Sequence, residues 1–200
     1  YLNLFIEGRM KAGDTVLVTG GNSGLASVII PMARAFGARV ITTVRNDAKA
    51  EAVSHLKADR VIVTDREDLA AALREELDAG HPVDIAIDCL GGDVMGRCLH
   101  YLARGARWIM IAALAGVKTE IDLKNIYVRN VRIIGSTLRS RAPEVKAEIL
   151  SSLVRDVWGK VSSGEIRPTI FKVLPITEAE AAHDLLYTSQ SVGKVVMTVE

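Results

Sequence analysis

Six short runs of apolar, largely β-branched residues recur between residues 15 and 135, and the first four are each followed by a segment with helical periodicity. The runs are nearly continuous, as in VDIAIDCL, which is typical of strands buried on both faces of a parallel sheet. With right-handed crossovers, this order predicts a doubly wound six-stranded parallel sheet, a Rossmann-type α/β fold. The predicted strands are Thr15–Thr19, Arg39–Val44, Arg60–Thr64, Asp84–Asp88, Ala106–Ile111 and Val131–Gly135. The predicted helices are Gly24–Phe36, Asp47–Lys57, Glu67–Ala79 and Gly92–Leu102.

Turn and cap signals support these boundaries. Gly37 follows the first helix where a C-cap is expected, and Asp47 and Asp65 stand at N-cap positions of the second and third helices. Pro31 is a departure, because proline removes a backbone donor and is expected to kink or loosen the first helix unless its first turn ends there. Beyond residue 135, Pro143 opens a long amphipathic segment, and a strand, a helix (177–190) and a strand are predicted to follow.

Composition excludes several classes of protein. The net charge is +1 with the two signs interspersed, which gives no support for a nucleic-acid or anionic-membrane partner. The longest apolar stretch, Trp108–Val117, is far shorter than the roughly 20 residues of a spanning helix, and no signal segment opens the chain. Cys89 and Cys98 lack the spacing of a disulfide framework or a metal site. We expect a cytoplasmic protein, and the apolar start at Tyr1 suggests a fragment of a longer one.

The turn between the first strand and the first helix is dense in glycine. A strand, a tight turn and a helix N-terminus bring backbone N–H groups and the positive end of the helix dipole together, which favours an anion. The sequence is neither a strict GxGxxG nor a P-loop, so a tight turn without ligand is the alternative. The predicted phosphate-binding residues are Gly20, Gly21, Asn22, Ser23, Gly24, Leu25 and Ala26.

The end of the second strand indicates which dinucleotide would bind. A carboxylate there usually binds the ribose 2′-hydroxyl of NAD, whereas a basic residue accommodates the 2′-phosphate of NADP. Here the strand runs into Arg45, with Lys49 beyond it, and a guanidinium can bind a phosphate bidentately. We therefore predict NADP(H) as cofactor; the alternative is that Arg45 is only a solvated loop charge.

Four separated motifs carry a family resemblance: GRMKAGDTVLVTGGNSGLASVIIPMARAFGARVITTVRN, VDIAIDCLGGDVMGRCLHYLARGARWIMI, NVRIIGSTLRSR and SGEIRPTIFKVLPITEAEAAHDLLYTSQSVGKVVMTV. In this order they resemble the quinone oxidoreductase (zeta-crystallin-like) branch of the medium-chain dehydrogenase/reductase superfamily. That branch usually has an Ala-x-x-Gly-x-x-Gly loop where this chain has Gly20, Ser23 and Ala26, so its pyrophosphate binding is expected to differ.

The resemblance implies a role for each matching position. Arg45 and Lys49 would hold the 2′-phosphate. The segment that would line the nucleotide is Asp88, Cys89, Leu90, Gly91 and Gly92. Ile111, Ala112, Ala113, Thr137, Leu138 and Arg139 would border the nicotinamide. Cys89 itself is more simply explained as a small buried hydrophobe than as a reactive thiol.

The resemblance also implies a division of the chain into a dinucleotide-binding domain, residues 1–165, and a C-terminal segment, residues 166–200, that returns to a GroES-like catalytic domain. The sequence does not include that domain, so the catalytic residues are unknown, and the C-terminal segment is expected to expose apolar surface. No metal is expected, because the four histidines are scattered and the branch is zinc-free.

The predicted function is an NADPH-dependent oxidoreductase that transfers hydride to a quinone or an α,β-unsaturated carbonyl compound. The alternatives are an enoyl-thioester reductase or a zinc-type alcohol dehydrogenase of the same superfamily, or a nucleotide-binding module without catalysis. The resemblance further implies a homodimer that pairs through the sixth strand, Val131–Gly135.

Overall fold

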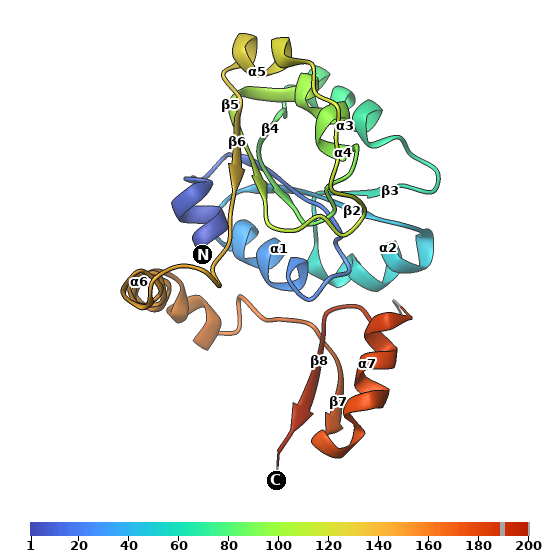
Figure 1. Cartoon of the computed structure of the whole chain (residues 1–200), viewed down its shortest axis with the longest axis vertical. Helices are drawn as coiled ribbons and strands as arrows, with labels where there is room; N and C mark the ends of the chain where they lie inside the picture. Colours follow the sequence, from blue (N-terminus) through green and yellow to red (C-terminus); the bar gives the residue numbers. More distant parts are fainter. Residues whose placement is uncertain (189–190, 200) are drawn as a thin grey trace.

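The computed structural model describes residues 1–188 and 191–199 and places six parallel strands in one sheet (Figure 1). Their order is β3-β2-β1-β4-β5-β6, so the chain first builds outward from β1 on one side and then on the other. This is the doubly wound order of dinucleotide-binding folds, and it confirms the predicted fold class. The strands are β1 Thr15–Val18, β2 Arg39–Val44, β3 Arg60–Val63, β4 Val83–Asp88, β5 Leu102–Met110 and β6 Arg132–Gly135.

Seven α-helices and four short π- or 3₁₀-helical turns connect the described strands. The α-helices are α1 Ala26–Ala35, α2 Asp47–Val53, α3 Leu69–Asp78, α4 Val94–Cys98, α5 Leu123–Arg129, α6 Pro143–Ser162 and α7 Ala179–Tyr187. The short turns are Leu2–Glu7, Ser54–Leu56, Leu99–Tyr101 and Ile176–Glu178. The turn at Leu2–Glu7 and α5 were not predicted from the sequence.

The sheet is buried on both faces, as its continuous apolar strands predict. Val16 and Val18 of β1 belong to a core that includes residues of α1, α2 and α6, whereas Leu17 between them joins a core with α3 and α4. Successive side chains of a strand point to opposite faces, so β1 to β5 each contribute to both cores, whereas the more exposed β6 packs only Ile134 against the first. Trp108 of β5 is fully buried in the second core.

Two predicted N-caps are wrong by one and three residues. Asn46, not Asp47, caps α2, since its side-chain oxygen accepts a hydrogen bond from the Lys49 N–H at 3.1 Å. Asp68, not Asp65, caps α3. The chain first makes a turn after β3, with the Glu67 N–H donating to the carbonyl of Val63, and only then enters the helix.

The ends of two other predicted helices also differ. The first helix begins at Ala26 rather than Gly24 and continues through Pro31 to Ala35, so Pro31 does not end it. Gly37 follows with φ +82°, which confirms the expected left-handed glycine after this helix. The predicted helix up to Leu102 is only the short α4 and a 3₁₀ turn, because β5 already begins at Leu102.

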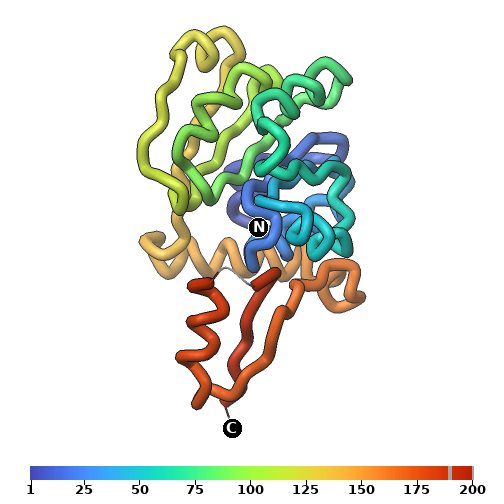
Figure 2. Tube along the Cα trace, turned by 90° about the vertical axis from the view of Figure 1, so that its right-hand side faces the viewer, coloured from blue at the N-terminus to red at the C-terminus, as the bar shows by residue number. Residues whose placement is uncertain are grey.

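The C-terminal part forms a unit of its own. Strands β7 (Ile170–Pro175) and β8 (Lys194–Thr198) pair in parallel, α7 connects them, and Figures 1 and 2 show this unit projecting below the sheet. The predicted helix end at residues 189–190 lies outside the described residues. Phe171, Val173 and Met197 are exposed, which confirms the expected apolar surface.

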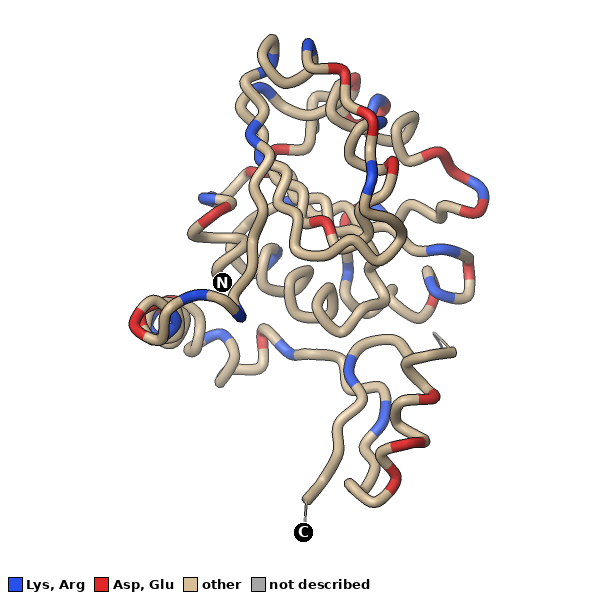
Figure 3. Tube along the Cα trace, viewed as in Figure 1, with Lys and Arg blue, Asp and Glu red and all other residues tan. Residues whose placement is uncertain are grey.

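Charges are distributed evenly along the chain. Figure 3 shows basic and acidic residues interspersed over the whole trace, as the sequence predicts. In the described ranges, no helix is long and apolar enough to cross a membrane.

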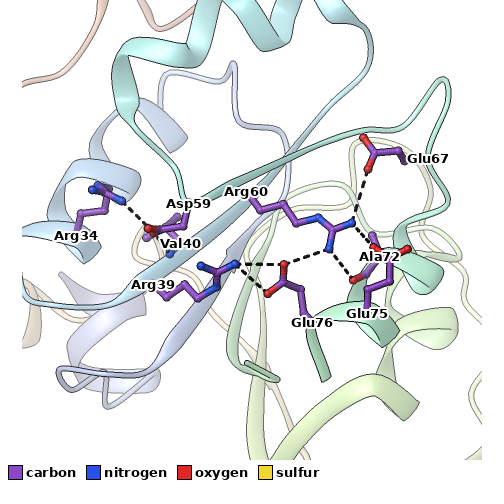
Figure 4. Close-up of polar contacts among 9 residues, drawn as sticks. All are labelled: Arg34, Arg39, Val40, Asp59, Arg60, Glu67, Ala72, Glu75 and Glu76. Carbon is purple, nitrogen blue, oxygen red and sulfur yellow. Dashed lines mark hydrogen bonds and ion pairs between the residues drawn. The ribbon is translucent and has the colours of Figure 1, made fainter. Parts of the chain in front are cut away.

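A charged network joins the amino ends of β2 and β3 to α3 (Figure 4). Glu76 of α3 is almost fully buried, and its carboxylate accepts hydrogen bonds from Arg39 at 3.0 Å and from Arg60 at 3.1 Å. Arg60 also pairs with Glu75 at 2.6 Å and lies 3.7 Å from Glu67. Because Arg39 and Arg60 begin two neighbouring strands, Glu76 holds the outer strands and α3 together.

We expect Glu76→Ala to lower the free energy of unfolding by about 3 kcal/mol, because it leaves two partly buried guanidinium groups without their shared buried partner. Glu75→Ala is the matched control: its carboxylate pairs with the same Arg60 but is largely exposed, so we expect a loss below about 1 kcal/mol. Urea denaturation of both variants measures the difference, and equal losses would contradict the structural role of Glu76.

Candidate functional site

One buried carboxylate organises the carboxyl end of the sheet. Asp88, the last residue of β4, is fully buried and accepts four hydrogen bonds. Its Oδ1 accepts from the Thr19 hydroxyl at 2.9 Å and from the N–H groups of Leu90 at 2.9 Å and Gly91 at 3.2 Å, and its Oδ2 accepts from the Trp108 indole at 3.1 Å. The carboxylate therefore fixes the end of β1, the turn after β4 and the core beneath them.

The turn after β4 lies against the segment that follows β5. The Ala115 N–H donates to the Leu90 carbonyl at 2.7 Å, and the Gly92 N–H donates to the Gly116 carbonyl at 2.8 Å. Gly91 has φ +64°, and a Cβ there would lie 2.6 Å from the Gly116 carbonyl oxygen, so only glycine fits. Six predicted cofactor-binding residues therefore stand in two adjoining segments: Cys89, Leu90, Gly91, Ile111, Ala112 and Ala113.

The glycine turn is anchored to the neighbouring strand β2. The Gly20 N–H donates to the Thr43 hydroxyl at 3.1 Å, and the Gly21 N–H donates to the Thr43 carbonyl at 2.7 Å. Gly20 has φ +71°, which confirms that it makes the sharp exit from β1. A Cβ on Gly21 would lie 2.5 Å from the Thr42 hydroxyl, so this glycine allows the turn to approach β2 closely.

The first turn of α1 leaves a backbone donor available. Within residues 1–188 and 191–199, the N–H group of Leu25 has no hydrogen-bond acceptor, whereas the Gly24 N–H faces the Gly193 carbonyl in a parallel β-bridge. The Ser23 hydroxyl accepts from the Ala26 N–H at 3.0 Å, which occupies another donor. Ala26 is itself buried in the core, as expected for a small residue where helix packs on strand. A free N–H group at a helix N-terminus fits an anionic group such as a phosphate.

The C-terminal unit reaches back to the glycine turn, which the sequence analysis did not foresee. The Gly193 N–H donates to the Asn22 carbonyl at 3.0 Å, and Gly193 forms a parallel β-bridge with Ser23. A Cβ on Gly24 would lie 2.6 Å from Cδ of Lys194, so the lysine side chain crosses directly over this glycine. In the sequence, Gly193 and Lys194 stand where β8 begins, far from the glycine turn along the chain.

Arg45 stands where the adenosine end of a dinucleotide would lie. It directly follows β2, is exposed, and its guanidinium has no ion pair or hydrogen bond within the described part of the chain. Lys49, one turn into α2, donates from Nζ to the Ser191 carbonyl at 3.3 Å. Arg45 is thus available to an anionic ligand, while Lys49 is engaged with the C-terminal unit.

A cleft of about 450 Å³ lies at the same end of the sheet. It brings together Leu25 of the glycine turn, Ile111 after β5, and Leu138 and Arg139 after β6. The remaining lining is Tyr1, Leu2, Asn3, Ser136, Thr137, Ile149, Leu150 and Leu153. Asn3 and Ser136 are cleft residues that the sequence analysis missed, because only the fold brings the N-terminal turn to the end of β6.

Cys89 is a half-buried thiol rather than a thiolate. Burial raises the pKa of Cys89 above its usual range, and its Sγ lies 3.3 Å from the Thr19 carbonyl oxygen, to which it donates. A protonated thiol is a poor nucleophile. This agrees with the interpretation of Cys89 as a packing residue.

A second cavity lies apart from this end of the sheet. It has a volume of about 400 Å³ and is lined by residues of the second half of α1, the turn Ser54–Leu56 and the segment after α6, including Arg34, His55 and Arg167. Over the described ranges, no three His, Cys, Asp or Glu side chains gather as a metal site would require, so the residues present do not fit a zinc ion.

Comparison with known proteins agrees with this geometry. The family model described as zinc-binding dehydrogenase matches residues 24–155. The chain is 27% identical over 190 residues to the 2-haloacrylate reductase of a Burkholderia species and 26% identical over 194 residues to the acryloyl-coenzyme A reductase of Metallosphaera sedula. These alignments cover 94% and 95% of this chain. The structure of a mycobacterial quinone oxidoreductase superposes with a TM-score of 0.83 and 25% identity over 99% of this chain.

The chain belongs to the zinc-binding dehydrogenase family and forms the C-terminal, nicotinamide cofactor-binding part of the medium-chain dehydrogenase/reductase superfamily. It spans 56% and 52% of the two reductases, 60% of the quinone oxidoreductase, and 8% of a highly reducing polyketide synthase of Cordyceps militaris that it also matches.

We expect Asp88→Asn to lower the free energy of unfolding by about 2–3 kcal/mol, because the amide replaces one accepting oxygen by a donor that faces donors. Asp84→Asn, in the same strand, is the control. Asp84 accepts the Thr15 N–H at 2.9 Å, and burial raises its pKa above the ordinary 3.8. A raised pKa means that folding favours the protonated form of Asp84. This contribution to the free energy of unfolding is complete below the ordinary pKa of an aspartate and is lost as the pH rises through the pKa of Asp84 in the folded protein.

Asp84→Asn should therefore leave stability at neutral pH unchanged or increase it, with the gain disappearing in acid. Urea denaturation at neutral and acidic pH compares the two variants. A neutral effect of Asp88→Asn would contradict the organising role of this carboxylate.

Proposed function

We propose that this chain binds NADP(H) at the carboxyl end of its sheet, as part of an oxidoreductase that reduces a quinone or an α,β-unsaturated carbonyl compound. The observation that carries the cofactor preference is Arg45: a guanidinium with no partner among residues 1–188 and 191–199 follows β2, where an NAD site usually has a carboxylate. Asp47, the nearest acid along the chain, is paired with Arg66 at 3.1 Å.

Each part of the site has a role in this proposal. The N–H group of Leu25 would bind the pyrophosphate, assisted by the Lys194 side chain that crosses the neighbouring Gly24. Arg45 would bind the 2′-phosphate, and the cleft beside Ile111 would hold the nicotinamide. When bound, the cofactor supplies the hydride, while the protein orients it and limits access of water.

The substrate class rests on relatives and on the lining of the cleft. The two reductases named above act, by name, on 2-haloacrylate and acryloyl-coenzyme A, and both compounds contain an activated double bond. The cleft offers mainly aliphatic side chains, among them Leu138, Leu150 and Leu153, which suit an apolar acceptor. An enoyl thioester is the second candidate substrate, supported by the acryloyl-coenzyme A relative.

One observation supports an alternative function, a nucleotide-binding module without catalysis. The Ser23 hydroxyl already occupies the Ala26 N–H, so one donor of the glycine turn is not available to a phosphate. Turnover of a simple quinone by the whole protein would exclude this alternative.

We further propose that residues 166–200 belong to a catalytic domain elsewhere in the protein. The exposed apolar residues of β7 and β8 support this division, because a parallel pair of strands alone does not bury them. The cytoplasmic location expected from the sequence is likewise a prediction.

We expect Arg45→Ala to weaken NADPH binding by about 1.5–3 kcal/mol, the range for a hydrogen bond to a charged group, and to leave NADH binding unchanged. The preference for NADPH over NADH should decrease as the salt concentration rises, because the guanidinium is exposed. Fluorescence titration with each nucleotide measures the two affinities. Arg74→Ala, which removes an exposed arginine of α3, is the matched control and should change neither affinity. Equal affinities of the parent chain for both nucleotides would contradict the role of Arg45.

We also propose a homodimer through β6, which is an edge strand of the sheet with Ile133 39% exposed. A lysine on this edge should prevent strand pairing, so Ile133→Lys is expected to be monomeric in sedimentation velocity. Leu150→Lys removes an exposed apolar side chain of α6 and should stay dimeric. A parent chain that is monomeric at all concentrations would contradict the proposal.

A further inference from the structure

The cleft contains one amide whose orientation is fixed by a neighbour. The Ser136 hydroxyl, just after β6, donates to Oδ1 of Asn3 at 2.6 Å. Ser136 is itself held in place, because its N–H donates to the Met110 carbonyl at the end of β5 at 2.9 Å. The amide of Asn3 is therefore positioned by the ends of two strands of the sheet.

This hydrogen bond determines which group Asn3 has left to offer. With Oδ1 occupied by a donor, the amide nitrogen Nδ2 carries the remaining two hydrogens. Nδ2 has no acceptor within residues 1–188 and 191–199, and it is not among the buried atoms that lack a partner, so solvent in the cleft reaches it. Asn3 thus presents a preoriented donor to the cleft.

The surroundings of this donor favour a carbonyl oxygen as its partner. Leu25, Ile111 and Leu138 line the same cleft, and they offer no side-chain acceptor. A bound ligand that displaces water from an amide nitrogen must supply an acceptor in its place, since an unpaired donor is costly in an apolar site.

We infer that Asn3 is a cofactor-binding residue whose Nδ2 donates to the carbonyl oxygen of the nicotinamide carboxamide. The inference rests on the proposed function, since it takes the cleft as the nicotinamide site. Ser136 is then a positioning residue that acts through Asn3. The N-terminal turn thereby contributes directly to a site otherwise built from loops at the carboxyl end of the sheet.

The test compares two probes that differ in the nicotinamide. NADPH contains the carboxamide, whereas 2′-phospho-ADP-ribose has the same phosphates and adenosine but no nicotinamide. Dissociation constants of this chain for both are measured by calorimetry. The variants are Asn3→Leu, which has a similar size and no donor, and Asn3→Asp, which keeps an oxygen to accept from Ser136 but has no Nδ2. Thermal unfolding of each variant reports whether the turn Leu2–Glu7 still packs.

In both variants, NADPH binding should weaken by roughly 2- to 12-fold relative to 2′-phospho-ADP-ribose, the range for one neutral hydrogen bond. Using the ratio of the two constants removes any general effect of the new charge in Asn3→Asp or of a loosened turn. If the ratio of the two dissociation constants stays at the parent value in both variants, the inference is overturned. Asn3 would then only anchor the N-terminal turn or bind a carbonyl of the substrate.

The outcome also separates this inference from the proposed function. A parent chain that binds both probes, with an unchanged ratio in the variants, overturns the role of Asn3 alone. A parent chain that binds neither probe overturns the proposed function and, with it, the role of Asn3.

Discussion

The carboxyl end of the sheet depends on the Asp88 carboxylate. A buried charge is tolerated only when donors surround it, and here a hydroxyl, two backbone amides and an indole do so. The same four bonds fix the end of β1, where the glycine turn begins, and the turn after β4. Since Trp108 is one of the donors, the hydrophobic core and the candidate site are connected through one side chain.

The two ends of the sheet are used differently. At the amino ends of β2 and β3, the carboxylate of Glu76 pairs with Arg39 and with Arg60 inside the protein (Figure 4). At the carboxyl ends, the N–H group of Leu25, the guanidinium of Arg45 and the amide nitrogen of Asn3 have no partner in the described residues. These three groups are available as hydrogen-bond donors to a ligand, which is what the proposed cofactor site requires.

The sequence predicts most of the fold because the strands are continuous apolar runs with clear glycine and aspartate boundaries. All six strands were found, whereas the caps at Asp47 and Asp65 were misplaced because several residues near a helix start could serve, and the turn geometry decides. The glycine turn and Arg45 were recognisable as candidate ligand-binding residues, since that proposal depends only on their neighbours in the chain. Asn3, Gly193 and Lys194 were not, because only tertiary folding brings residues from both ends of the chain to the site.

We propose that the edge of the sheet organised by Asp88 binds a nicotinamide dinucleotide. Hydrogen–deuterium exchange of the chain with and without NADPH tests it most directly. We expect slower exchange on binding in the glycine turn, residues 20–26, in the turn after β4, and in the N-terminal turn at Asn3. Protection that appears instead around the cavity at Arg34 and His55, or no protection anywhere, would contradict it.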